Sequence, residues 1–169
     1  LSRKELGKFL EGIMLLLEIQ MPVTFKRSEA IGETGHAFSD ASGEDDGEIA
    51  SCGAVNFLPD GQVIAWEYKC DKSSWPPLYR YAIQPIMFYE ALAEFINIVT
   101  MGYKFFNMYL CEHIDNQAVV YAYVKGDTSC AVATNIIIAS LLVKVKLQIM
   151  AYYDYIISEV NVGDAVTRT

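Results

Sequence analysis

The stretch Phe38-Ser39-Asp40-Ala41-Ser42-Gly43 places an aspartate where a short apolar strand gives way to small turn residues. Such turn residues leave the carboxylate without a bulky neighbour to cover it. Three more carboxylates stand in comparable settings: Glu90 between apolar residues of a helical segment, Asp115 before Asn116, and Asp164 after Asn161. Three of the four acids thus fall at a strand end or in the first turn of a helix.

Working outward from Asp40, the sequence predicts an antiparallel meander with strands over 35–40, 49–58 and 62–68. A polar turn over 43–47 and the signal Pro59-Asp60-Gly61 separate them. Helices are expected over 2–19, 83–101, 116–125, 130–146 and from 161, strands over 103–114 and 147–157, and a linker over 21–33. Strands alternating with helices after a meander predict an α/β domain with a mixed five-stranded sheet flanked by helices.

The composition is that of a folded domain, with 169 residues, 53% hydrophobic and 20% charged. No apolar run approaches the roughly 20 residues of a membrane span. Four widely spaced cysteines without a Cys-x-x-Cys pair indicate free thiols in a reducing compartment, and so an intracellular protein of the cytoplasm or nucleus. The chain opens without Met on charged residues, which we interpret as a fragment of a longer protein.

The net charge of -8 is unusual for a protein that binds nucleic acid, because affinity for a phosphate backbone comes mainly from Lys and Arg. We expect contact with phosphates to depend on a few basic residues near the acids, with Lys72, Arg80, Lys104 and Lys125 as candidates. Further affinity would come from elsewhere in the parent protein.

Taken singly, each acid has an ordinary structural interpretation. Asp40 fits a turn after a strand, Asp115 the N-cap of the helix from Asn116, and Asp164 a capping box with Asn161. Glu90 fits a solvated helix position, and Glu94 competes with it one turn later.

Taken together, the acids indicate a metal site. The carboxyl ends of parallel strands meet at one edge of a sheet, so these side chains are expected to converge there. Unpaired carboxylates repel one another, and hard divalent cations such as Mg²⁺ or Mn²⁺ relieve that repulsion because they prefer oxygen ligands. No basic residue sits beside Asp40, Glu90 or Asp115 in the sequence to neutralise them.

The four motifs resemble those of the ribonuclease H domain of retroelement reverse transcriptases. They are Asp40-Ala41-Ser42, Glu90-Ala91-Leu92-Ala93, Asp115-Asn116 and Asn161-Val162-Gly163-Asp164-Ala165-Val166-Thr167-Arg168, with Gly163 and Thr167 where the family has Ala and Ser. The segments 119–123 and 125–129 are similar to the tyrosine-recombinase type of retrotransposon. The resemblance covers 34–169 as the ribonuclease H-like domain, and 1–33 resembles the end of a thumb or connection region.

The resemblance implies a ribonuclease H-like fold and an endonuclease that hydrolyses the RNA strand of RNA–DNA hybrids with two Mg²⁺ or Mn²⁺ ions. Asp40 would bridge both ions, Glu90 and Asp115 would hold the ion at the leaving 3′-oxygen, and Asp164 the ion that activates water. The implied partners are the hybrid and the upstream polymerase region of the same polyprotein. The oligomeric state is not indicated.

Two alternatives remain open on the same fold. The low isoelectric point, near 4.7, and the acidic loop Glu44-Asp45-Asp46 favour a catalytically weak or inactive protein-interaction module. The aromatic stretch over 75–81 would then be its docking surface. A DNA-directed nuclease or resolvase of the same superfamily would use the same four acids, because no motif here distinguishes RNA from DNA.

Overall fold

The computed structural model describes residues 32–44, 49–71 and 85–167. The helix expected over 2–19, nearly all of the linker over 21–33, and the aromatic stretch over 75–81 lie outside the described residues. The elements are β1 (Thr34–Glu44), β2 (Ile49–Phe57), β3 (Val63–Asp71), α2 (Pro85–Met101), η3 (Gly102–Phe105), β4 (Tyr109–Ile114), α3 (Gln117–Lys125), α4 (Ala131–Lys146), β5 (Met150–Tyr155), η4 (Ser158–Val160) and α5 (Asp164–Thr167).

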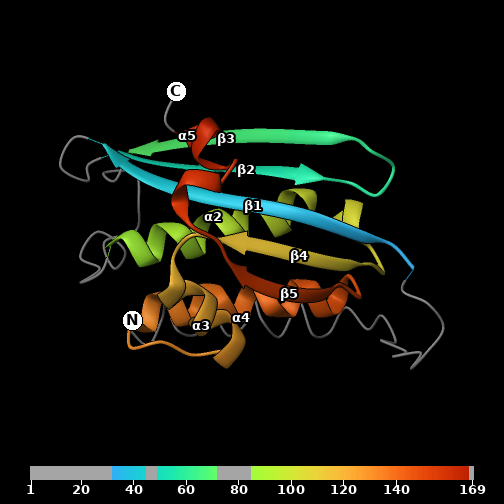
Figure 1. Ribbon diagram of the computed structural model, residues 1–169. Coiled ribbons are helices and arrows are strands. Elements are labelled where there is room, and N and C mark those ends of the chain that lie inside the picture. The colour runs from blue at the N-terminus through green and yellow to red at the C-terminus, as the bar shows by residue number, and fades with distance from the viewer. Residues whose placement is uncertain (1–31, 45–48, 72–84, 168–169) are drawn as a thin grey trace.

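The strands form one sheet in the order β3-β2-β1-β4-β5 (Figure 1). The β3-β2-β1 meander is antiparallel, whereas β1 pairs with β4, and β4 with β5, in parallel. The parallel ladder between β1 and β4 runs from Thr34 opposite Tyr109 to Phe38 opposite His113. The prediction of a mixed five-stranded sheet flanked by helices is therefore confirmed.

Several predicted boundaries are wrong. Strand β1 continues past Asp40 to Glu44, because β2 supplies ladder partners from His36 as far as Glu44. The strand expected over 103–114 begins only at Tyr109: a 3-10 turn precedes it, Phe105 is buried in the core, and Asn107 has a left-handed φ of 57°. A similar turn at Gln148, also with φ 57°, precedes β5, so the strand expected over 147–157 begins only at Met150.

The last helix, expected from residue 161, starts at Asp164 after the 3-10 turn η4.

The two faces of the sheet are covered unequally. Helix α2 packs against β1, β2 and α4, and Figure 1 shows it behind the sheet. The main hydrophobic core lies between, where Cys52 of β2 and Ile114 of β4 meet Tyr89 and Ala91 of α2. The short helix α5 packs instead over β1, β2 and β3. Among the described residues, no helix has the length and apolar character needed to span a bilayer.

Candidate metal centre

Asp40 and Asp115 come together where the parallel ladder between β1 and β4 ends. The last ladder pair is Phe38 with His113, and each aspartate lies two residues beyond its member of that pair. Because side chains alternate along a strand, both aspartates face the same side of the sheet as Phe38 and His113. Asp40 is therefore inside strand β1 rather than at its end, but it sits at the end of the β4 ladder.

Glu90 reaches the same place from the helix-covered side. Beyond Phe38, strand β1 has no partner on its β4 side, and the Ala41 N–H donates to the Glu90 carboxylate. Glu90 is 4% exposed, and its Oε2 atom is buried without a hydrogen-bond partner. Burial raises the pKa of Glu90 well above its usual range, and the charges of Asp115 and Asp40 raise it further.

Asp164 is brought in by the start of α5. The Asn161 side chain anchors this segment to β1 by donating to the Ser39 carbonyl at 3.3 Å, and its oxygen accepts from the Gly163 N–H at 3.0 Å. Gly163 lies so close to β1 that an added Cβ would be 3.1 Å from the Cβ of Asp40. A small residue at 163 is thus what allows Asp164 to approach.

The sequence analysis missed two residues that support Asp40. The Thr167 hydroxyl donates to Asp40 Oδ2, and the Ser42 hydroxyl donates to the Thr167 carbonyl at 3.0 Å. Opposite Asp40 in the β1–β2 ladder stands Gly53, whose missing side chain leaves room for Thr167: a Cβ there would lie 2.9 Å from Thr167 Cγ2. The available signal was the hydroxyl of Thr167, three residues after Asp164 in the same motif.

The resulting geometry is a tight group of carboxylates. Oxygen atoms of Asp40, Asp115 and Asp164 all lie within 4.8 Å of one another. That group does not include Glu90, but Glu90 interacts electrostatically with all three aspartates. Burial raises the pKa of Asp40 to about 6, the Thr167 hydrogen bond lowers it, and the charges of Asp164 and Asp115 raise it.

The structure also decides between the alternative interpretations of single acids. Asn116, not Asp115, is the N-cap of α3, because its side chain accepts from the N–H groups of Ala118 and Val119. The Asn161 N–H donates to the Ser158 carbonyl, so it is not held in a capping box by Asp164.

Glu94 lies apart from the metal centre. Its carboxylate contacts Lys144, Tyr123 and Ser140 on the helix-covered side.

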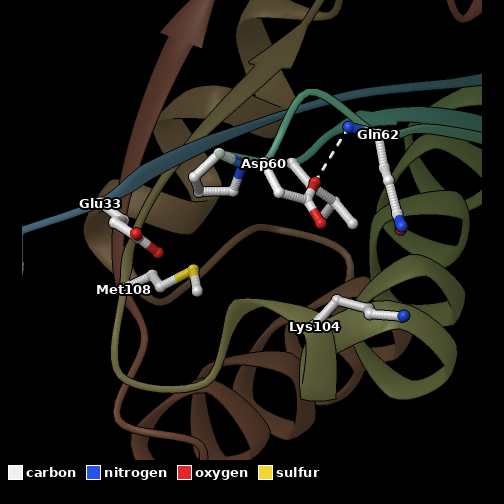
Figure 2. A pocket seen from close by; sticks show the side chains of 7 residues that line it. Glu33, Asp60, Gln62, Lys104 and Met108 are labelled. Carbon is white, nitrogen blue, oxygen red and sulfur yellow. Dashed lines mark hydrogen bonds between the residues drawn. The ribbon is translucent and has the colours of Figure 1, made fainter.

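The structure places two of the four basic residues that were proposed as phosphate contacts. Lys104 lines a cavity of about 260 Å³ at the other end of the sheet, where β1 and β4 begin, so its proposed place beside the site is wrong. Lys104 and Met108 face the turn residues Asp60 and Gln62 across that cavity (Figure 2). Lys125 ends α3, the helix that follows Asp115, whereas Lys72 and Arg80 lie outside the described residues.

The donor set fits a hard divalent cation. In the described part of the chain, no Lys or Arg forms an ion pair with Asp40, Glu90 or Asp115. All four acids offer carboxylate oxygens, the ligands that Mg²⁺ and Mn²⁺ prefer. The unpartnered, buried Glu90 Oε2 needs either a proton or a cation, and a cation would also relieve the repulsion among the aspartates.

Comparisons with known proteins identify the fold. No protein-family model and no curated protein sequence matches the chain. Similar solved structures include ribonuclease H1 of the halophilic archaeon Halobacterium salinarum, at 14% identity and a TM-score of 0.63, over 80% of this chain and 95% of that one.

Two further structures agree with the first. The N-terminal RNase H domain of a Mycobacterium tuberculosis protein, solved as a fusion with maltose-binding protein, has 12% identity and a TM-score of 0.54, over 81% of this chain and 92% of that one. The ribonuclease H1 named LC11, isolated from compost by a metagenomic approach, has 12% identity and a TM-score of 0.53, over 76% and 87%. The chain therefore has the ribonuclease H fold.

Proposed function

We propose that this chain is a divalent-metal-dependent endonuclease that hydrolyses the RNA strand of RNA–DNA hybrids. The observation that carries the proposal is the meeting of carboxylates from β1, α2, the end of β4 and the start of α5. The likeness to solved ribonucleases H supports the choice of reaction.

The four acids would hold two Mg²⁺ or Mn²⁺ ions. Asp40 would contribute to both ion sites. Glu90 and Asp115 would hold the ion near the leaving 3′-oxygen, and Asp164 would hold the ion near the attacking water. When bound, such ions neutralise charge on the scissile phosphate and lower the pKa of water. Phosphoryl transfer needs mainly positioning and charge neutralisation, which suits a site without a covalent nucleophile.

The protein's own contribution is to hold the carboxylates in place before substrate arrives. Thr167 fixes one oxygen of Asp40, and the Ala41 N–H orients Glu90. Backbone and hydroxyl donors of this kind set the orientation of metal ligands and are part of the site's design. The buried position of Glu90 on α2 keeps that ligand rigid.

We further propose that the domain works within a reverse transcriptase of a retroelement, with 1–33 as the end of the preceding thumb or connection region and 34–169 as the ribonuclease H-like domain. The upstream polymerase region would then add contacts to the same hybrid, which raises effective concentration without changing the site. The free thiols of Cys111 and Cys130 fit the reducing cytoplasm or nucleus.

The test is cleavage of a hybrid labelled on its RNA strand by the 169-residue protein, with Mn²⁺ or Mg²⁺. Asp115→Asn keeps the side-chain shape but removes a charged ligand, so it should abolish cleavage without unfolding the protein. The matched control is Asp60→Asn, in the β2–β3 turn far from the site, where Asn can still accept from the Gln62 N–H. Equal cleavage by wild type and Asp115→Asn would reject the assignment.

Matched DNA duplexes and single strands in the same assay test the DNA-directed alternative. Cleavage of DNA but not of hybrid RNA would replace the proposed substrate while keeping the site. If the wild type binds Mn²⁺ but cleaves none of these substrates, the interaction module becomes the better interpretation.

A further inference from the structure

A second group of ionisable side chains is buried on the helix-covered side of the sheet. Lys144 of α4, Glu94 of α2 and Glu112 of β4 are 2%, 1% and 2% exposed. None of them belongs to the carboxylate group of the metal centre. Burying three charged groups is costly unless each is paired, so their arrangement calls for a structural or functional reason.

Lys144 is the centre of this group. Its Nζ contacts Glu94 Oε1, donates to Glu112 Oε2 at 2.6 Å, and donates to the Tyr153 hydroxyl at 2.6 Å. The same ammonium lies 4.9 Å from the ring centroid of Tyr123 and 4.6 Å from that of Tyr153. Two carboxylates, a hydroxyl and two aromatic rings therefore enclose it.

Glu94 is held by further donors. The Tyr123 hydroxyl donates to its Oε2 atom, and the Ser140 hydroxyl lies 2.7 Å from the same atom. Burial opposes ionisation of Glu94, but the charge of Lys144 together with hydrogen bonds from Glu112, Lys144 and Tyr123 lowers the pKa of Glu94. Burial and the charge of Glu94 raise the pKa of Glu112. The Lys144 ammonium thus lies between one carboxyl whose pKa is lowered and one whose pKa is raised.

The position of this group relative to the metal centre is informative. Glu94 lies one turn after Glu90 on α2, and Glu112 lies on β4, three residues before Asp115, which directly follows that strand. Apolar contacts between a helix and a sheet are not directional and permit small sliding movements. Ion pairs and hydrogen bonds have defined geometry, so they specify one register of α2 against β4.

We infer that Lys144 is a positioning residue for the metal centre: by holding Glu94 of α2 and Glu112 of β4 at once, it fixes Glu90 relative to Asp115 and so maintains metal affinity. The inference rests on the proposed function for the identity of the metal centre. Lys144 itself touches neither Glu90 nor Asp115 in the contacts described above, and it acts through the helix and the strand.

The test uses the charge-balanced variant Lys144→Met/Glu94→Gln. It removes one positive and one negative charge together. Burial raises the pKa of the remaining Glu112, which favours its neutral form and avoids leaving an unpaired ion in the core. The control is Lys146→Met/Glu159→Gln, which makes the same chemical changes at less buried positions. Thermal unfolding gives stability, and calorimetry with Mn²⁺ alone, well below the melting temperature, gives metal affinity.

The expected result is a loss of Mn²⁺ affinity of roughly tenfold in the folded variant, comparable to the loss of an outer-shell partner, with the control unchanged. Lower stability with wild-type Mn²⁺ affinity would show a purely structural role and overturn the inference. If the double variant does not fold, Tyr153→Phe removes only the hydroxyl that Lys144 contacts. It should weaken Mn²⁺ binding by about threefold, the size of one net hydrogen bond, and unchanged affinity would overturn the inference.

The assay also separates this inference from the proposed reaction. A wild-type protein that binds Mn²⁺ but cleaves no hybrid would refute the endonuclease while the affinity comparison still supports Lys144 as a positioning residue. A wild-type protein that binds no Mn²⁺ would overturn both.

Discussion

Replacing Asp40 by Asn should stabilise the metal-free protein while destroying its metal site. Asn has nearly the same shape, and its carbonyl oxygen can still accept from the Thr167 hydroxyl. What the change removes is a buried negative charge that faces Asp164 and Asp115. The acid is therefore costly to the fold, and under the proposed function it is cation binding that requires it.

The expected gain in unfolding free energy follows from the pKa of Asp40. Burial and the two acidic neighbours raise this pKa from 3.8 to about 6. A difference of about 2 pKa units corresponds to about 3 kcal/mol. Asp115 and Asp164 are only half-buried, so solvent screens part of the repulsion, and we take about half of that value. A gain of about 1.5 kcal/mol raises the melting temperature by about 3–6 °C in a domain of this size.

The effect of Asp40→Asn on stability depends on pH. Because the pKa of Asp40 is raised in the folded state, the folded protein binds the proton more tightly, and stability falls as pH rises through about 6. The penalty is fully present above that pKa and disappears below about pH 4, where folded and unfolded states are both protonated. The advantage of Asp40→Asn should thus be seen at pH 7.5 and vanish at pH 4.

The assay is thermal unfolding in EDTA and in Mn²⁺ at both pH values. With Mn²⁺ at pH 7.5 the order should reverse, because the wild type gains stability from binding and the variant does not. Glu159→Gln, at an exposed position, controls for the change in net charge. If Asp40→Asn is less stable than wild type in EDTA at pH 7.5, the four carboxylates do not repel one another as the structure implies.

Three other predictions follow from the same contacts. Gly53→Val fills the space that Thr167 occupies, so α5 should be displaced and Mn²⁺ affinity lost with β1 and β2 still paired; unchanged calorimetry would contradict this packing. Glu90→Gln should abolish cleavage without loss of stability. Glu94→Gln should instead cost roughly 3–5 kcal/mol of unfolding free energy by breaking a buried ion pair, as denaturant titration would show. Hybrid binding by this acidic chain should be weak, with a shallow salt slope of about -0.9 per phosphate neutralised; a steep slope would reveal a basic surface that the fold assembles from distant residues.

The order of elements was predictable because each has a local signal. The turn Pro59-Asp60-Gly61 separates two strands, and Gly126, with a left-handed φ of 74°, ends α3 as expected. The errors lie where tertiary packing overrides local pattern. The aromatic run before β4 has strand-like composition, but burial of Phe105 draws it into a 3-10 turn.

For the site, the sequence by itself determined the four candidate carboxylates and the alternation of side chains along each strand, because both are local properties of the chain. It placed Asp40 at a strand end, whereas Asp40 lies inside β1 and meets Asp115 because β1 pairs with the distant strand β4 in parallel.

Only the tertiary structure decided between Glu90 and Glu94. The two acids lie one helical turn apart with similar apolar neighbours, so no local pattern separates them. Glu94 is paired with Lys144, fifty residues later in the chain, while Glu90 meets the Ala41 N–H, forty-nine residues earlier. The support of Asp40 by Thr167 likewise depends on a contact across 127 residues. Such partners are set by which surfaces pack together, and burial makes those contacts strong enough to fix the position of each acid.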